Sequence, residues 1–256
     1  MCKYTYDDLL YNDLKIFQHK NGYRSSEDSL ILQDCILNYT SKNFLGNAFE
    51  FGTGCGIISI LLAAKRENIS LTSIEVQSSL YELAEKNVKY CELSPKITLI
   101  HMDGRNVAKK FSPGTFEIAF SNPPFFEPNE GRLSPIRERQ IAKHEILCSL
   151  VDILDIFSYL LKLDGMGFVI YPKTRCLQFD SELYKRRDNL KPIAYKFYQN
   201  YANEVKINLM PKFQKPKKGE SSPQNSFLPP NKFSEIIAQN NFNLFVAVVQ
   251  KIRNYD

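Results

Sequence analysis

An alternation of short apolar, β-like runs with helical stretches constrains the fold of this chain more than any other feature of its sequence. The β-like runs are 47–52, 70–75, 96–101 and 115–121, and the stretches 57–68 and 78–92 between them carry apolar residues at helical spacing. Such alternation is typical of βαβ units, in which a crossover helix joins two parallel strands. We therefore expect an α/β fold built on a mostly parallel sheet.

The same pattern continues in the second half of the chain. After a polar loop at 126–143, the sequence predicts a long amphipathic helix at 145–162, a strand at 165–171, another helix near 174–189, and strands at 193–200 and 204–210. Placed as late antiparallel strands, the last two runs would complete a Rossmann-like, seven-stranded, mostly parallel sheet with helices on both faces.

We divide the chain into four segments. Residues 1–46 form an N-terminal extension, in which the amphipathic stretch 29–39 predicts a helix that packs on the core, and residues 47–210 form the main α/β domain. Residues 211–231 are rich in Lys, Pro, Ser and Gln, which is typical of an exposed loop. Residues 232–256 are expected to form a tail that packs on or beside the same domain.

Composition excludes several classes of protein. With 43% hydrophobic and 24% charged residues in 256, an apolar core is available, and collagen-like and repeat classes are excluded. The six cysteines include no CxxC pair and only three histidines occur, so we expect no zinc site, no disulfide framework and reduced thiols. The first residues carry acids, unlike a signal peptide, and no apolar run approaches the roughly 18 residues of a membrane span. We expect a soluble, cytoplasmic protein whose net charge of +5 permits a polyanionic partner without requiring one.

Three of the 11 glycines stand in alternation, directly after a predicted strand and before a predicted helix. They are Gly52, Gly54 and Gly56 in the segment 50–56, which reads EFGTGCG. A glycine-rich turn at this place lets the backbone approach a ligand closely and directs helix N-terminal N–H groups at it. Glu50 precedes the turn, and its carboxylate would repel a pyrophosphate but would suit a ligand with an ammonium or sulfonium group.

Two more acids follow the next two predicted strands. Glu75 ends the run 70–75, at the place where an acid accepts hydrogen bonds from both hydroxyls of a ribose, and Asp103 follows 96–101, where it could accept from an adenine amino group. Either acid taken alone is more often a helix cap or a turn residue. Because all three acids stand at successive strand ends, where open α/β sheets bind ligands, we interpret them as ligand-binding residues.

The fourth β-like run ends in the segment 121–126, which reads SNPPFF. Asn-Pro-Pro alone could be a strand-ending turn. Beside the glycine turn, however, the side-chain carbonyl of Asn122 and the backbone carbonyl of Pro123 can both accept from one planar NH2 group, and Phe125 can stack on the ring that carries it. Orienting the two N–H bonds favours a pyramidal nitrogen whose lone pair faces an electrophile. The segment indicates amino-group chemistry that requires neither a metal nor a nucleophilic residue.

These segments resemble those of class I S-adenosylmethionine-dependent methyltransferases. Residues 50–56 are similar to their ExGxGxG cofactor turn, and Asn122-Pro123-Pro124-Phe125 to the (D/N/S)PP(Y/F/W) motif of the members that methylate amino groups. A narrower resemblance, over about residues 15–240, is to the bacterial tRNA adenine-N6 methyltransferases that modify adenine 37 of a valine tRNA. It rests on the segments GYRSSED at 22–28, AKHE at 142–145, which would open the long helix, and the Lys-rich stretch around Lys215, Lys217 and Lys218.

The resemblance implies a cofactor, a partner and a set of site residues. The cofactor would be S-adenosylmethionine, with S-adenosylhomocysteine as product and no metal, and the partner a tRNA, with no obligate protein partner and no membrane. The catalytic residues implied are Asn122, Pro123, Pro124 and Phe125. Those implied for cofactor binding are Tyr23, Arg24, Glu50, Gly52, Gly54, Gly56, Glu75, Asp103 and Asn122. For Arg24, a structural salt bridge is an equal alternative.

A tRNA substrate would also need contacts to its phosphates, because a target base in an anticodon loop must be splayed out of its stack and held. The residues expected to make such contacts are Arg137, Arg139, Lys143, His144, Lys212, Lys215, Lys217 and Lys218. The alternative for the Lys-rich stretch is a solubilising loop, and for the segment around Arg137 a cap on the sheet.

Two other functions remain open at the level of sequence. Methylation of a glutamine amide in a translation release factor uses similar Asn-Pro-Pro-aromatic chemistry, but such enzymes normally carry a separate helical N-terminal domain, for which residues 1–46 leave little room. A non-catalytic RNA-binding protein could retain the fold. The intact segments 50–56 and 122–125 argue against this second alternative.

Overall fold

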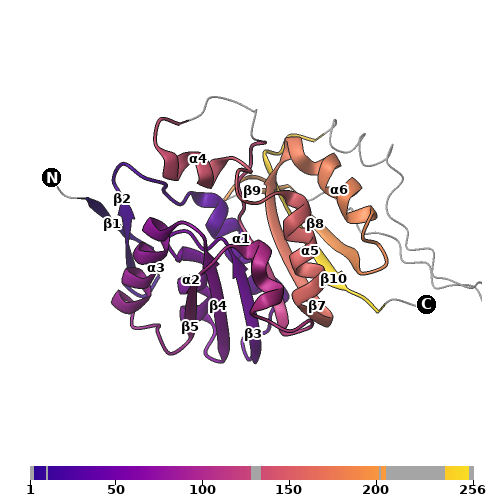
Figure 1. Cartoon of the computed structure of the whole chain (residues 1–256), viewed down its shortest axis with the longest axis horizontal. Helices are drawn as coiled ribbons and strands as arrows, with labels where there is room; N and C mark the ends of the chain where they lie inside the picture. Colours follow the sequence, from indigo (N-terminus) through magenta and orange to yellow (C-terminus); the bar gives the residue numbers. More distant parts are fainter. Residues whose placement is uncertain (1–2, 10, 128–133, 202, 206–239, 254–256) are drawn as a thin grey trace, which may run out of the picture.

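The computed structural model describes residues 3–9, 11–127, 134–201, 203–205 and 240–253. Its centre is an eight-stranded sheet with the strand order β5-β4-β3-β6-β7-β10-β8-β9 (Figure 1). The strands are β3 (Gly46–Phe51), β4 (Ile69–Glu75), β5 (Ile97–His101), β6 (Phe116–Ser121), β7 (Leu161–Pro172), β8 (Leu190–Asn200), β9 (Asn203–Val205) and β10 (Leu244–Lys251). Neighbours from β5 to β7 pair in parallel, whereas β10 is antiparallel to β7 and β8. The expected seven-stranded, mostly parallel sheet is confirmed, and β9 adds a short edge strand.

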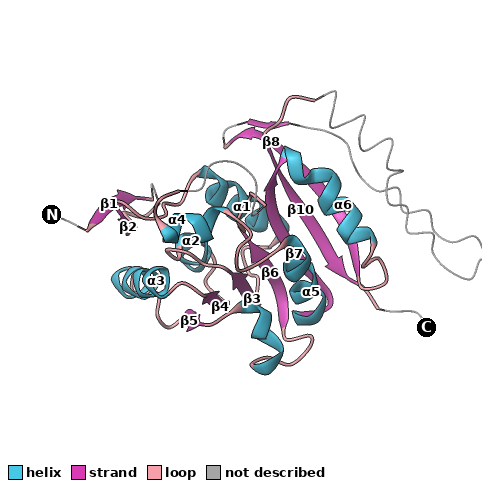
Figure 2. Cartoon of the chain, turned by 45° about the horizontal axis from the view of Figure 1, so that its top comes forward, coloured by secondary structure: helices cyan, strands magenta, loops and turns pink. Residues whose placement is uncertain are grey.

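Helices cover both faces of the sheet (Figure 2). The helices α1 (Glu27–Tyr39), α2 (Ile57–Lys65) and α3 (Ser78–Tyr90) pack on one face, and η1 (Gly104–Lys109), α5 (Leu150–Leu160) and α6 (Cys176–Tyr184) pack on the other. Successive residues of a strand point to opposite faces, so Ala48 lies in the core beside α2 whereas Phe49 lies in the core beside α5. The parallel crossovers bring the carboxyl ends of β3, β4, β5 and β6 to one edge, where ligands bind in this class of sheet.

A two-stranded antiparallel hairpin precedes the main sheet and was not predicted from the sequence. It consists of β1 (Tyr4–Asp8) and β2 (Lys15–His19) and packs on α3. The side chain of Asn87 in α3 accepts from the Phe17 backbone N–H at 2.8 Å and donates to the Phe17 carbonyl at 2.9 Å, which extends the edge of β2. Asn12 and Asp13 in the connection have φ of +47° and +56°, a left-handed conformation that Asn and Asp tolerate better than most residues. The Asn-Asp pair was therefore the sequence signal from which this hairpin turn could have been predicted.

The strand that completes the sheet is β10, not the predicted run 204–210. β10 lies between β7 and β8, and its apolar sequence LFVAVVQK is buried on both faces, as expected for an interior strand. The run 204–210 contributes only through β9, which pairs with β8, and residues 206–210 lie outside the described residues. The segment 211–231 also lies outside them, and the division of the chain into four segments stays a prediction.

The predicted helix at 145–162 begins later, and the predicted polar loop before it contains another helix. Helix α4 (Arg137–Lys143) ends before His144, and α5 begins only at Leu150. The start of α5 is fixed by a capping box, in which Asp152 N–H donates to the Ser149 hydroxyl at 3.3 Å and Ser149 N–H donates to the Asp152 carboxylate at 2.8 Å. The segment 142–145 therefore does not open the long helix. No helix in the described part of the chain has the length and apolar character to cross a membrane.

Candidate functional site

The glycine-rich turn between β3 and α2 adopts a backbone that only glycine accommodates without strain. Gly52, Gly54 and Gly56 have φ of +71°, +60° and +87°. The N–H groups of Gly52 and Thr53 donate to the Ile74 carbonyl at 3.0 Å, which ties the turn to the end of β4. A Cβ at Gly54 would lie 3.5 Å from the Tyr23 ring, which therefore covers the turn from the N-terminal segment.

Glu75 lies at the end of β4 beside this turn. Its carboxylate accepts from the N–H of Gly54 at 2.9 Å, of Val76 at 3.0 Å and of Gln77 at 2.9 Å. Burial raises the pKa of Glu75, and the three backbone donors act in the opposite direction because they favour the ionised form. The backbone thus orients a buried carboxylate at the edge of the sheet.

Glu50 occupies a different place from the other acids. Its side chain is 1% exposed and accepts from the Thr53 hydroxyl at 2.6 Å and from the Ser59 hydroxyl at 2.5 Å, so it links β3 to the turn and to α2. Burial raises its pKa from the ordinary 4.5 to about 7. Glu50 does not line the cavity described next, and a direct contact between Glu50 and a ligand stays a prediction.

A cavity of about 650 Å³ opens at the carboxyl edge of β3, β4 and β6. Eight of the expected site residues line it: Tyr23, Gly52, Gly54, Glu75, Asp103, Asn122, Pro123 and Pro124. Phe51, Ile74, Leu80 and Met102 give it apolar walls. Arg24, Glu50, Gly56 and Phe125 are not among its lining residues. We call this space the first cavity.

Asp103 lies at the rim of the first cavity and begins η1. Its carboxylate accepts from the Arg105 backbone N–H at 2.9 Å and forms an ion pair with the Arg105 guanidinium at 2.5 Å. Hydrogen bonding from Arg105 holds the pKa of Asp103 below its usual range, so the carboxylate is ionised and able to accept from a ligand.

A second cavity of about 590 Å³ adjoins the first, and the two share Tyr23, Asn122, Pro123 and Ala142. Phe125 and Phe126 line the second cavity, together with Arg24, Ser26, Asp28 and Lys143. Asn122 and Pro123 thus stand between an acid-bearing cavity and an aromatic one. This relation between the two cavities could not be read from the spacing of the residues in the sequence.

The Asn122 carboxamide is oriented by a residue that sequence reasoning missed. Its Nδ2 donates to the Ser29 hydroxyl of α1 at 3.2 Å, and the Ser29 hydroxyl in turn contacts the Ser25 hydroxyl at 2.8 Å. With the nitrogen side of the carboxamide engaged by Ser29, the oxygen side is the part that can accept from a ligand.

Helix α4 forms a wall of both cavities and is anchored by Glu138. The Glu138 carboxylate accepts from the Tyr23 N–H at 2.7 Å and from the Ser79 hydroxyl at 2.7 Å, and lies 3.0 Å from Nδ1 of His19. Although burial opposes ionisation, these hydrogen bonds hold the pKa of Glu138 below its usual range. A Cβ at Gly22 would lie 2.0 Å from Oε1 of Glu138, so the contact requires glycine at that position.

The residues expected to bind RNA fall into three groups. Lys143 is exposed and lines the second cavity, and Arg137 is exposed on α4. Arg139 donates to the Gly22 carbonyl at 2.7 Å, and His144 is buried with its ring 5.6 Å from the Phe126 ring, so both take part in internal contacts. Lys212, Lys215, Lys217 and Lys218 lie outside the described residues.

Arg24 forms the salt bridge that the sequence left open as an alternative. Its guanidinium lies 2.7 Å from the Asp7 carboxylate and donates to the Thr5 hydroxyl at 2.5 Å. Arg24 lines the second cavity rather than the first. In the described part of the chain, no three His, Cys, Asp or Glu side chains form a group that could hold a metal ion, and the five described cysteines are free thiols.

Comparisons with known proteins agree with this architecture. Residues 27–144 match the family model of the methyltransferase small domain. A protein of a Flavobacteriaceae bacterium (strain 3519-10), named tRNA1(Val) (adenine(37)-N6)-methyltransferase, is 25% identical over 56% of this chain and 60% of its own length. A protein of the same name from Dyadobacter fermentans is 27% identical over 48% of this chain and 49% of its own length. The chain thus spans between about half and three fifths of these relatives.

Solved structures support the same fold. The structure of a predicted O-methyltransferase from Agrobacterium tumefaciens superimposes with a TM-score of 0.54 at 12% identity, covering 88% of this chain and 81% of that one. Together, the domain match and the sheet topology support the Rossmann-like fold of class I methyltransferases.

Proposed function

We propose that this protein transfers a methyl group from S-adenosylmethionine to the exocyclic N6 of an adenine in tRNA. The observation that carries the proposal is that Asn122 and Pro123 line both cavities. This residue pair would face the cofactor in the first cavity and the acceptor base in the second. The methyltransferase small-domain match supports the reaction class, and the names of the relatives support the tRNA adenine.

The first cavity has the chemistry that S-adenosylmethionine requires. Glu75, held by three backbone donors, can accept from ribose hydroxyls, and Asp103 can accept from the adenine amino group. The apolar walls beside Phe51 and Met102 suit a purine ring. When bound, the cofactor supplies an electrophilic methyl group on a sulfonium sulfur.

The second cavity has the chemistry that a splayed base requires. Phe125 and Phe126 provide rings for stacking, and the Asn122 side-chain oxygen and the Pro123 carbonyl oxygen can accept from the two N–H bonds of one amino group. These acceptors would aim the nitrogen lone pair at the first cavity. Methyl transfer would form the bond between this nitrogen and the methyl carbon while the bond from that carbon to the sulfonium sulfur breaks, which would leave the thioether S-adenosylhomocysteine, and the nitrogen would release one proton to solvent.

The exposed cations of α4 support a nucleic-acid substrate. Lys143 lines the second cavity, and Arg137 lies at the other end of the same short helix, so both can meet phosphates flanking the base. The Lys-rich stretch at 212–218 would add further phosphate contacts.

The proposal is tested by methyl transfer from labelled S-adenosylmethionine to total tRNA from a strain that lacks this protein, followed by nucleoside mass spectrometry. We expect N6-methyladenosine to appear with the parent protein and not with Asn122→Ala. Incorporation into a different nucleoside would contradict the adenine assignment. Incorporation into a release-factor glutamine instead of tRNA would contradict the assignment of RNA as substrate. Binding of tRNA without any binding of the cofactor would contradict the assignment of the protein as an enzyme.

A further inference from the structure

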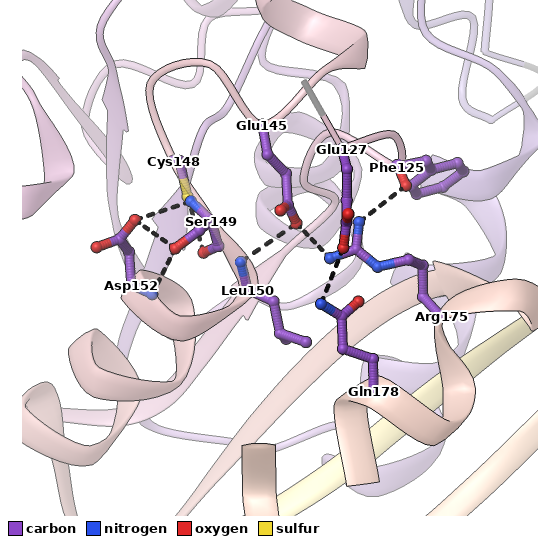
Figure 3. A network of polar contacts seen from close by, with 9 residues as sticks. All are labelled: Phe125, Glu127, Glu145, Cys148, Ser149, Leu150, Asp152, Arg175 and Gln178. Atoms are coloured by element: carbon purple, nitrogen blue, oxygen red, sulfur yellow. Dashed lines mark hydrogen bonds and ion pairs between the residues drawn. The ribbon is translucent and has the colours of Figure 1, made fainter. Parts of the chain in front are cut away.

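A buried ion pair joins the Asn122–Phe125 segment to the wall of the first cavity. The guanidinium of Arg175 lies 2.7 Å from the Glu145 carboxylate, and the two side chains are 4% and 8% exposed (Figure 3). The other terminal nitrogen of Arg175 donates to the Phe125 backbone carbonyl at 3.2 Å. One planar guanidinium therefore contacts two segments that are far apart in the sequence.

The topology of the sheet explains why these segments meet. β6 and β7 are parallel neighbours, so the chain leaves both at the same edge. Phe125 follows the end of β6, and Arg175 follows the end of β7, at the start of α6. Glu145 lies in the connection between α4 and α5, which continues to Leu147 and Cys148 in the wall of the first cavity. The guanidinium is thus held between the acceptor side and the cofactor side of the site.

Aromatic packing reinforces the same connection. The Tyr171 ring of β7 lies 6.2 Å from the Phe125 ring and 5.3 Å from the centre of the Arg175 guanidinium. Glu145 also accepts from the Leu150 N–H at 3.2 Å, at the first residue of α5. Phe125 is therefore fixed through its ring by Tyr171 and through its backbone by Arg175.

Stability is a weak reason for a protein to contain such a pair. The cost of removing two charges from water can exceed the energy that their attraction returns, and replacing such a pair by well-packed apolar residues of similar volume is often neutral for stability. Apolar residues cannot, however, donate a hydrogen bond to a backbone carbonyl and hold a carboxylate at a fixed angle.

We propose that Arg175, held by Glu145, is a positioning residue for methyl transfer: it fixes the backbone of the Asn122–Phe125 segment relative to the cofactor wall. It touches neither cofactor nor acceptor, and it acts through the Phe125 carbonyl. This inference rests on the proposed function for its kinetic consequence, but its structural consequence can be measured without turnover.

The test replaces both charges at once, because Arg175→Met alone would leave the Glu145 carboxylate buried without a partner. In the double variant Arg175→Met/Glu145→Leu we expect a melting temperature close to that of the parent, because relief from burying two charges offsets the loss of the hydrogen bonds to the Phe125 carbonyl and the Leu150 N–H. The dissociation constant for S-adenosylmethionine should change by less than about threefold, whereas kcat should fall by about 100-fold, as expected for a misplacement of about 1 Å at the reacting atoms. Arg186→Met removes an arginine that pairs with Asp155 and Glu182 and lines neither cavity, so it is the matched control and should retain kcat.

Amide hydrogen exchange provides the readout that is independent of activity. The Phe126 N–H donates to the Lys143 carbonyl and the Glu145 N–H to the Phe126 carbonyl, so loosening the segment should expose both amides. We expect exchange at the amides of positions 126 and 145 to accelerate at least about tenfold in the double variant and to stay unchanged in Arg186→Met. Arg175→Lys, which keeps the charge but lacks the planar fork, should retain stability and show an intermediate kcat.

Three results would overturn the proposal. Unchanged exchange at the amides of positions 126 and 145 in the double variant would show that the pair does not order the segment. Faster exchange with unchanged kcat would show a structural role only, and a loss of kcat explained by lost cofactor binding would place the effect in the first cavity. If the parent has no transferase activity, the proposed function fails, and the exchange measurement still decides whether Arg175 orders the segment.

Discussion

The carboxamide nitrogen of Asn122 lies 3.2 Å from the hydroxyl oxygen of Ser29, although 93 positions separate the two residues in the chain. The contact joins the end of β6 to α1, and Ser29 is 2% exposed. A buried hydroxyl in this place fixes the orientation of the carboxamide, because it accepts from the NH2 group while it shares a hydrogen bond with the Ser25 hydroxyl.

Ser29→Ala should lower kcat with little effect on cofactor binding. A hydrogen bond between neutral groups contributes about 0.5–1.5 kcal/mol, so a loss of about threefold to tenfold in kcat is expected when the carboxamide is free to rotate. Steady-state kinetics on tRNA, with cofactor affinity from calorimetry, measure the two effects separately. Ser158→Ala, on α5 away from both cavities, is the control. An unchanged kcat in Ser29→Ala would show that Asn122 keeps its orientation without this contact.

Asn122→Ala and Glu75→Ala should separate catalysis from cofactor binding. Asn122→Ala removes an acceptor for the amino group and should abolish turnover while the dissociation constant of the cofactor stays nearly unchanged. Glu75→Ala should weaken cofactor binding first. Because this substitution also leaves three backbone N–H groups without their acceptor, Glu75→Gln, which keeps one acceptor oxygen, is the companion variant. Equal losses of binding and turnover in both variants would contradict the assigned roles.

The architecture of the sheet could be predicted from sequence because each βαβ unit is a local pattern. Register and strand order between distant segments are not local: β10 is separated from β8 by more than 40 residues, and its place between β7 and β8 depends on pairing at both edges. Helix boundaries were missed where a single cap decides them. The capping box of Ser149 and Asp152 starts α5, although the apolar pattern favoured an earlier start.

The residues of the candidate site also fall into those that local sequence patterns indicated and those that depend on contacts between distant segments. Gly52, Glu75 and Asn122 could be identified from their positions after predicted strands, and they line the first cavity. Ser29, Glu138 and Arg175 contact site residues that lie far along the chain, so no spacing in the sequence indicated them. For Glu50, charge alone suggested a contact with a cationic ligand, whereas the structure shows its carboxylate accepting hydrogen bonds from the hydroxyls of Thr53 and Ser59.

Gly22→Ala should destabilise the protein by displacing α4. The added Cβ would lie 2.0 Å from Oε1 of Glu138 and 2.6 Å from Cβ of His19, and overpacking of this kind costs about 1–3 kcal/mol. Because α4 lines both cavities, cofactor affinity should fall as well. Denaturant unfolding and calorimetry measure the two effects. Adding Glu138→Ala to Gly22→Ala removes the obstructing carboxylate, so the double variant should lose less stability than the two single variants lose together. A loss in the double variant equal to that sum would contradict this steric account.

Glu50 should make the protein less stable as the pH rises from about 4.5 to about 7. Its folded pKa of about 7 lies above the ordinary 4.5, so the folded state retains a proton that the unfolded chain has already lost. The associated stability is fully present below pH 4.5 and is lost as the pH rises through 7, which amounts to about 3 kcal/mol at 1.36 kcal/mol per pH unit. Urea unfolding at pH 5 and pH 8 measures the effect, and Glu50→Gln, which cannot ionise, should reduce the difference between the two pH values. Ser59→Ala removes one hydrogen-bond donor to the Glu50 carboxylate but keeps the ionisable group, so this variant should retain the pH dependence of stability. If Glu50→Gln also retains the pH dependence, a group other than Glu50 is responsible for it.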